Sequence, residues 1–401
     1  MHLNMRLPKV DPLELHPPTH CPLRDRRHPK QKCSGTHFKP HQLHCRKPLR
    51  DTQHTQVIAR RYRCLKCKRT FRVYPTGVSH AHQSDTLKGL SVLLYILGLS
   101  YRGVADLLEA LQYPLSKTTV YENVQAAGYR AIQLRRAWVR HQAGPVKVLG
   151  LDFTHVKCHG QNKIVAVATA VLTGEPLTFD LVPSESALHT EQWIRDLAHS
   201  IGAEIVVTDD ADGLKTVADD LALQQQICRA HVNRNVHDLI GTLGEKALDH
   251  PDPVPWELKA HAEHVSVDQF LEDVQTAEFV IKALPADGQR QLEQLIERYQ
   301  FAPPPSQGHK ATMWYRFRRL VLDWHENWSR LTLFQRWRGL QQEKLDGTNN
   351  VTEQIIGQRV KERYRTMRGY KREESILNVS SLIGWLGVKG HENDLRELVA
   401  S

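Results

Sequence analysis

Length, composition and charge place this chain among basic proteins with several domains. It has 401 residues, 40% of them hydrophobic and 24% charged, which predicts two or three domains with cores of their own. The net charge of +10 is uneven, because residues 1–90 hold 19 Lys/Arg against 5 Asp/Glu and carry +14, whereas the remaining 311 residues carry −4. A basic arm on a near-neutral body predicts a polyanionic partner, with an acidic membrane surface as the competing interpretation.

Hydropathy and cysteine usage exclude further classes of protein. No apolar run reaches the roughly 18–20 residues that span a bilayer, and the longest candidate covers only residues 89–99. The start of the chain lacks the apolar segment of a secretory signal. Most of the seven cysteines lie before residue 68, which favours metal binding in a reducing compartment over a disulfide framework. We therefore expect a cytoplasmic, nucleoid-associated protein that does not act at a membrane.

The N-terminal region joins a stretch rich in Pro and His to one rich in Cys. Residues 1–20 predict a mobile leader, and residues 21–80 predict a small, basic, zinc-ribbon-like segment. The CxxC turn that ends at Cys67 is a half-site, because such a turn presents two thiolates to one tetrahedral Zn²⁺. The favoured ligand set is Cys21, Cys33, Cys64 and Cys67. The alternatives are a basic loop without metal, or ligands drawn from Cys45, His28, His37 and His41.

Three short helices are predicted over residues 84–132. Ser84, Ser100 and Ser116 stand where N-caps are expected. The pattern is typical of a helix-turn-helix DNA-binding domain, whose recognition helix enters the major groove by its N-terminal end. The DNA-contact candidates at that end are Lys117, Thr118, Thr119, Tyr121 and Asn123. The alternative is a three-helix unit that only packs against a neighbour.

The pattern changes from helical to β near residue 145. Strand-like runs cover much of residues 146–184, followed by a helix, the run EIVVTDD (204–210), a second helix and a run around 224–231. Three meandering strands followed by helix, strand, helix and strand is the ribonuclease-H-like order, an α/β fold with a mixed sheet and helices on its faces. Residues 145–231 therefore predict the first part of such a core.

The remainder of the chain is predicted to be helical. Residues 232–345 predict an all-helical insertion domain, and residues 346–401 predict a return to the core with C-terminal helices. In the insertion, apolar side chains recur at helical spacing at Trp314, Phe317, Val321, Trp324 and Trp328. This stripe favours a helical core, with a tryptophan stacked on an unpaired base as the alternative.

Three acids stand where a two-metal phosphodiester enzyme needs its ligands. Asp152 and Asp209 each end an apolar run, and Glu353 lies at the start of a predicted helix. Hard Mg²⁺ or Mn²⁺ ions take carboxylate oxygens together with substrate phosphates. Asp210 and Asp212 compete with Asp209, because strand alternation lets only one of an adjacent pair point into the site.

The third acid has a structural alternative. Asn350 and Glu353 fit a capping box, in which the glutamate side chain bonds the start of its own helix. This interpretation stands beside the catalytic one. Weaker candidates for the third acid are Glu343, Asp346 and Glu362.

Four segments together carry a family resemblance: LDFTHV around Asp152, VVTDDADGLKTV around Asp209, CRAHVNRNV at 228–236 and TNNVTEQIIGQRVK around Glu353. Over roughly residues 145–385 the chain resembles the DDE transposases of bacterial insertion sequences, in the branch akin to Mutator-like elements that carries a C/DxxH signature. In such families the second aspartate precedes a Gly-Leu pair by four residues. Gly213 therefore points to Asp209 rather than Asp210.

The resemblance also implies a role for a CxxH pair. Alone, Cys228 and His231 would more often be a packed thiol and a hydrogen-bonded imidazole than a metal half-site. The C/DxxH signature of the family maps onto them and implies a structural or DNA-handling feature beside the fifth strand. The helical insertion before the glutamate helix matches the family as well.

The resemblance implies a transposase that cuts DNA at transposon ends and joins them to a target. Asp152, Asp209 and Glu353 would hold two Mg²⁺ or Mn²⁺ ions, and the N-terminal segments, with Zn²⁺ in the ribbon, would bind the terminal repeats. Pairing of two transposon ends implies a homodimer or a larger assembly on DNA. The alternatives are a domesticated DNA-binding protein without catalysis, and a ribonuclease-H-like nuclease without strand transfer.

Overall fold

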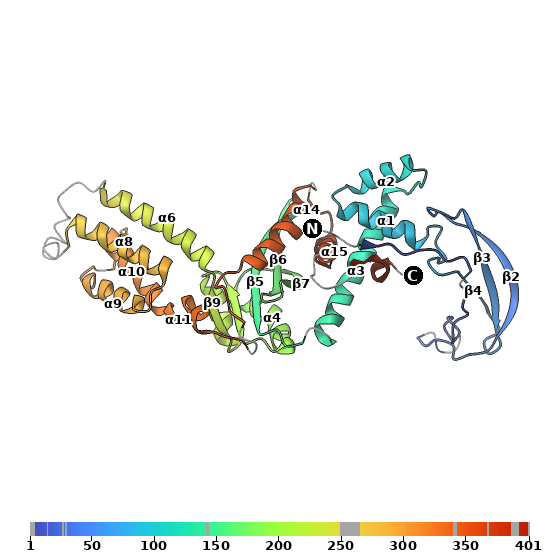
Figure 1. The fold of residues 1–401 in the computed structure, drawn as a ribbon, viewed down its shortest axis with the longest axis horizontal. Helices are drawn as coiled ribbons and strands as arrows, with labels where there is room; N and C mark the ends of the chain where they lie inside the picture. Colours follow the sequence, from blue (N-terminus) through green and yellow to red (C-terminus); the bar gives the residue numbers. More distant parts are fainter. Residues whose placement is uncertain are drawn as a thin grey trace.

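Figure 1 shows an elongated molecule whose parts follow one another along its long axis. A three-stranded sheet lies at one end, three helices lie next to it, a five-stranded sheet lies in the middle, and a helical insertion forms the other end (Figure 1). The protein is therefore mixed α/β. The computed structural model describes residues 5–13, 15–25, 28, 30–141, 144–248, 265–302, 304–305, 307–308, 310–339, 343–366, 369–385 and 393–399.

The N-terminal sheet is antiparallel, in the order β2-β3-β4. Its strands are β2 (Phe38–Pro48), β3 (Gln56–Cys64) and β4 (Thr70–Val73). Much of β3 alternates between buried and exposed residues, as expected for a strand with one covered face. β2 is an edge strand and is exposed along most of its length.

Part of the stretch 1–20, for which the sequence predicts a mobile leader, lies against the rest of the protein. β1 (Met5–Arg6) pairs in parallel with β10 (Asn393–Asp394), close to the far end of the chain. Leu7 packs against the core formed by the three helices. These contacts bring the two ends of the sequence together.

The three predicted helices are present, and each is capped as expected. They are α1 (Asp85–Ile96), α2 (Tyr101–Ala110) and α3 (Lys117–His141). The hydroxyls of Ser84, Ser100 and Ser116 accept backbone N–H groups of the first turns, those of Leu87, Gly103 and Thr119.

Helix α3 continues past residue 132, because its C-terminal part packs on other elements of the protein. α15 (Glu373–Trp385) crosses α3 at Gly128, where a Cβ atom would lie 2.3 Å from the carbonyl oxygen of Asn378. Glycine is needed there to let the two backbones approach. α16 (Leu395–Val399) contributes to the same core.

The central sheet is mixed, with strand order β7-β6-β5-β8-β9. β5, β6 and β7 form an antiparallel meander, and β8 and β9 run parallel to β5. The strands are β5 (Val148–Cys158), β6 (Gln161–Ala170), β7 (Glu175–Val182), β8 (Ile205–Thr208) and β9 (Gln224–Ile227). One core joins this sheet to α4 (Ala187–Ile201) and α5 (Asp212–Asp220), and another joins it to the helices α1, α3 and α15.

The insertion is a helical unit with its own core. Its helices are α6 (Arg229–Leu248), α8 (Val267–Ala283), α9 (Gly288–Arg298), α10 (Met313–Glu326) and α11 (Trp328–Leu331), after which α12 (Leu333–Arg336) leads back to the sheet. All five members of the predicted aromatic and aliphatic stripe are buried in this core. The prediction of a helical core at 314–328 is confirmed.

The chain then returns to the central sheet through α13 (Asn350–Ile355), a π-helical turn η1 (Ile356–Lys361) and α14 (Glu362–Arg365). α13 lies against β5 and β6 and carries Glu353. Among the described residues, no helix is both long and apolar enough to cross a membrane.

Candidate functional site

The parallel pairing of two strands brings Asp152 and Asp209 to the same level of the sheet. Gly150 on β5 pairs with Val207 on β8, which is where the parallel pairing ends. Asp152 stands two residues further along β5, and Asp209 directly follows the last residue of β8, two residues after Val207. Because side chains alternate along a strand, both acids are expected on one face.

Helix α13 is held against β5 by a small group of buried polar contacts. The side-chain amide of Asn349 donates to the carbonyl oxygen of Leu151 at 2.9 Å, and the hydroxyls of Thr352 and Thr169 are 2.7 Å apart. A Cβ atom at Gly150 would lie 2.4 Å from Thr352 Oγ1, so only glycine leaves room for the helix. These contacts place the residue after Thr352, which is Glu353, beside the strand that carries Asp152.

Asp209 and Glu353 both influence the titration of Asp152. The pKa of Asp152 is raised to about 6, first by burial and further by the negative charges of Asp209 and Glu353. The backbone N–H of Phe153 and the nearby His231 oppose this shift only in part. Within the described part of the chain, the three carboxylates are not all within 4.8 Å of one another. Their charges interact, but their oxygen atoms are not in direct contact as a group.

The surroundings of Asp209 differ from those of the two competing acids, Asp210 and Asp212. Asp210 forms an ion pair with Lys215 at 3.0 Å, and the Asp212 side chain is 97% exposed at the start of α5. Of the adjacent acids, Asp209 is the one whose charge raises the pKa of Asp152.

Glu353 does not adopt the capping-box arrangement that the sequence also allows. The residue that precedes the first turn of α13 is Asn349 rather than Asn350. The Glu353 carboxylate lies 3.5 Å from Nδ1 of His231, on another part of the chain. Of the weaker candidates for the third acid, Asp346 accepts hydrogen bonds from Thr348 next to it.

Cys228, His231 and Glu353 form a compact cluster that the sequence did not predict as a unit. One ligand atom of each lies within 4.8 Å of the others. Burial raises the pKa of the Cys228 thiol, but interactions with His231 and with the backbone N–H of Asn349 outweigh it, so the pKa lies below its usual value. Interaction with Cys228 raises the pKa of His231. The CxxH spacing signals two members of this cluster, whereas Glu353 joins them only through the fold.

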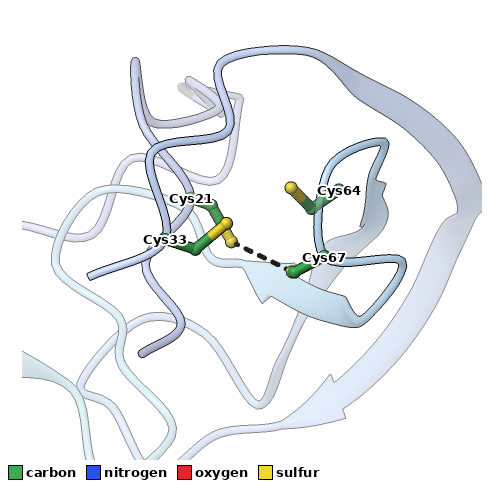
Figure 2. A group of neighbouring side chains, drawn as sticks. All are labelled: Cys21, Cys33, Cys64 and Cys67. Carbon is green, nitrogen blue, oxygen red and sulfur yellow. Dashed lines mark hydrogen bonds between the residues drawn. The ribbon is translucent and has the colours of Figure 1, made fainter. Parts of the chain in front are cut away.

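The four cysteines predicted as metal ligands come together at the end of the N-terminal sheet. Figure 2 shows Cys64 and Cys67 on one turn, facing Cys21 and Cys33 on a separate part of the chain. The Sγ atoms of Cys21 and Cys67 are 3.8 Å apart, and all four ligand atoms lie within 4.8 Å of one another. Within the described residues, this cluster includes none of the alternative ligands Cys45, His28, His37 and His41. The four cysteines could hold a metal ion.

The long gap between Cys21 and Cys33 is closed by a local β-bridge. Arg24 and Lys32 pair in antiparallel fashion, and the backbone N–H of Cys33 donates to Leu23. The ends of the gap therefore lie side by side although eleven residues separate them in sequence. Gly35 lines the cluster, since a Cβ atom there would lie 2.5 Å from Sγ of Cys64.

Some of the predicted DNA-contact side chains are exposed, and others are hydrogen-bonded within the protein. Lys117 and Thr118 are exposed at the start of α3, and Thr119 shares a hydrogen bond with Ser116. The hydroxyl of Tyr121 lies 3.1 Å from that of Ser375.

Asn123 requires a correction. Its side chain is only 8% exposed, and its amide hydrogen-bonds Gln83 and Ser91. It ties α3 to α1 and to the segment before α1, so it does not belong to an exposed DNA-contact face. The sequence predicts that Asn123 lies near the start of this helix, but it does not predict which side of α3 packs against α1.

A test of the cysteine cluster compares two cysteines of the same segment. Cys64→Ser should lower the metal content of the purified protein by about one ion per chain and make the N-terminal sheet sensitive to protease, because metal binding and folding are coupled in small metal sites. Elemental analysis and limited proteolysis measure both. Cys45→Ser, which lies outside the cluster, is the control and should change neither. Equal metal content in the two variants would contradict a metal site at Cys64.

A second prediction concerns the buried charge of Asp152. Its pKa in the folded protein is about 6, above the ordinary value of 3.8, so stability falls as the pH rises between these values and the whole cost is present at higher pH. Asp152→Asn removes this charge. At pH 8 without divalent ions, the variant should be more stable than the wild type by about 1–3 kcal/mol.

Thermal and urea unfolding measure this difference, which should disappear below about pH 4 because both side chains are then neutral. Asp212→Asn is the control and should have little effect, since that carboxylate is exposed. If the wild type were as stable as the Asp152→Asn variant at pH 8, the claim that the ionised Asp152 carboxylate destabilises the folded protein would be wrong.

Comparisons with known proteins gave no relative from which a function could be transferred: no protein-family model matches the chain, and no curated protein matches it.

Proposed function

We propose that this protein is a DNA transposase that binds transposon ends and carries out metal-dependent phosphodiester cleavage and strand transfer. The observation that carries the proposal is geometric: the parallel pairing of β5 with β8 brings Asp152 and Asp209 to the same end of the two strands, and α13, which carries Glu353, docks on β5. Carboxylates that the fold gathers from distant parts of a sequence are suitable ligands for two-metal phosphodiester chemistry.

The topology supports this proposal. An antiparallel meander of three strands, followed by two strands parallel to the first, agrees with the ribonuclease-H-like fold that we propose for the central domain. In this arrangement the first acid stands on the central strand β5 and the second follows the neighbouring strand β8. The third comes from α13, which returns to the sheet after the helical insertion.

The donor set fits Mg²⁺ or Mn²⁺. Three carboxylates favour a hard cation, which takes oxygen ligands. Bound positive charge would stabilise the ionised form of Asp152, whose pKa is raised mainly by burial and further by the charges of Asp209 and Glu353. When bound, two such ions supply Lewis acidity to the attacking and leaving oxygens of the phosphodiester. Asp152, Asp209 and Glu353 would hold them. The contacts of Asn349 and Thr352 fix the direction from which the Glu353 carboxylate approaches.

The N-terminal region supplies the proposed DNA-docking surface. Exposed basic side chains occur on all three strands of its sheet, at Lys39, Arg46, Arg60, Arg63 and Arg72. Lys117 is exposed at the start of α3. We assign Zn²⁺ to the four-cysteine cluster, since four thiolates suit a closed tetrahedral zinc site. Transposition joins two ends, so the working form would be a dimer or larger assembly on DNA.

The catalytic assignment predicts a specific pattern of loss. Asp152→Asn, Asp209→Asn and Glu353→Gln should each lower Mg²⁺-dependent cleavage of end DNA at least about 100-fold, because each removes a charged ligand at nearly constant volume. Binding of end DNA, measured by mobility shift, should change little. The matched control is Asp212→Asn, which alters an exposed acid a few residues from Asp209 and should cleave normally.

The outcomes distinguish the alternatives. A protein that binds end DNA but cleaves none with Mg²⁺ or Mn²⁺ would be the non-catalytic form, and one that cleaves without joining ends to target DNA would be a nuclease. Robust cleavage by the Glu353→Gln variant would remove that residue from the proposed site.

DNA docking through the basic region predicts a steep salt dependence. Each neutralised phosphate releases counterions, so log Kobs for end DNA should fall linearly with log salt concentration. Lys117→Ala should reduce the slope by about one. Lys310→Ala, an exposed lysine in the helical insertion, is the control and should keep the slope. A flat response of the wild type would contradict docking through this surface.

A further inference from the structure

The cluster of Cys228, His231 and Glu353 has the composition of a transition-metal site. It combines a thiol, an imidazole and a carboxylate, which are the three ligand types that zinc accepts. Cys228 follows directly after β9, and His231 lies in the first turn of α6. Glu353 approaches from α13. The junction between β9 and α6 therefore meets α13 at one point.

The separations between the ligand atoms suit one shared ion. Sγ of Cys228 lies 3.9 Å from Oε1 of Glu353, and Nδ1 of His231 lies 3.5 Å from the same oxygen. Bond lengths of about 2.3 Å to sulfur and about 2.0 Å to nitrogen or oxygen, at a tetrahedral angle, require separations of about 3.3–3.5 Å between ligand atoms. Shifts of a few tenths of an ångström would satisfy them.

One nitrogen of this cluster has no hydrogen bond. Nδ1 of His231 is buried and makes no hydrogen bond. A close polar neighbour is the Glu353 carboxylate at 3.5 Å. Buried polar atoms in folded proteins are nearly always hydrogen-bonded, so this nitrogen is available as a ligand to a metal ion. Sγ of Cys228 already accepts the backbone N–H of Asn349 at 3.2 Å, which is the kind of contact that orients a thiolate ligand.

We propose that Cys228, His231 and Glu353 bind Zn²⁺, and that this ion inhibits the protein by withdrawing Glu353 from the proposed catalytic metal site. The inhibition rests on the proposed function, whereas the binding of zinc does not. Three protein ligands leave a fourth position for water or an oxygen of bound DNA.

Ligand chemistry explains why zinc would compete rather than assist. Mg²⁺ and Mn²⁺ prefer oxygen ligands, while thiolate and imidazole favour zinc, which also binds more tightly than either across the divalent series. Glu353 is the only member common to both proposed sites, so its carboxylate can serve one ion at the expense of the other. Asp152 lies close enough to His231 for their charges to interact, and its negative charge would favour a cation at either position.

Binding is tested with Co²⁺, which replaces zinc and reports thiolate ligands by a charge-transfer band. Full-length wild type should bind one more ion per chain than Cys228→Ser and than His231→Ala. The measured quantity is the difference in bound Co²⁺ per chain between the proteins. Ions bound by the four-cysteine cluster contribute equally to each protein and do not affect this difference. Cys158→Ser, a buried cysteine on β5 outside both clusters, is the matched control and should bind as the wild type does.

Equal stoichiometry and affinity in wild type, Cys228→Ser and His231→Ala would overturn the site. Circular dichroism and thermal unfolding establish that the variants are folded. Because two different ligands are removed in separate proteins, misfolding of one variant leaves the other as the test.

Inhibition is tested by titrating Zn²⁺ into Mg²⁺-dependent cleavage of end DNA. Each protein is compared with its own rate without zinc. The half-inhibitory zinc concentration should rise at least about tenfold in Cys228→Ser relative to the wild type and to Cys158→Ser, since loss of even an outer-shell partner weakens metal sites 10–100-fold. Unchanged inhibition, or stimulation by zinc, would overturn the inhibitory role. Absence of any Mg²⁺-dependent cleavage would instead overturn the proposed function and leave the cobalt result standing.

Discussion

The candidate site depends on the docking of the first turn of α13 onto β5. Asn349 reaches the carbonyl oxygen of Leu151, and Thr352 meets Thr169 on β6, all within a buried layer. Such contacts are strong constraints because an unpaired polar group in that layer would cost free energy. Gly150 makes them possible by leaving the space that any side chain would fill. Without this docking, Glu353 would not lie in the same field as Asp152.

The same docking also sets the surroundings of the Glu353 carboxylate. It places the Glu353 carboxylate next to Cys228 and His231, and close enough to Asp152 for their charges to interact. Burial is the main cause of the raised pKa of Asp152, and the charges of Asp209 and Glu353 add to it. If both proposed metal sites form, Glu353 would belong to both, and the two ions would compete for its carboxylate.

The two ends of the molecule depend on different stabilising interactions. The helical insertion has a core of aromatic and aliphatic side chains and is held by burial. The N-terminal sheet is small, and its core consists largely of the cysteine cluster with Tyr62, Phe71 and Val73. A metal ion at the four cysteines would add to the stability of this domain, because metal binding and folding are coupled in small metal sites.

Local patterns in the sequence predicted the elements and many of their residues. The serine caps, the apolar stripe of the insertion, the β-rich middle and the CxxC turn of Cys64 and Cys67 all depend on short-range rules of spacing and propensity. Tertiary structure decided what those rules cannot reach: that Asn123 faces the first helix, that Asn349 rather than Asn350 precedes α13, and that Glu353 meets Cys228 and His231. These outcomes depend on which elements pack together, and contacts between residues far apart in sequence leave no local periodicity by which they could be recognised.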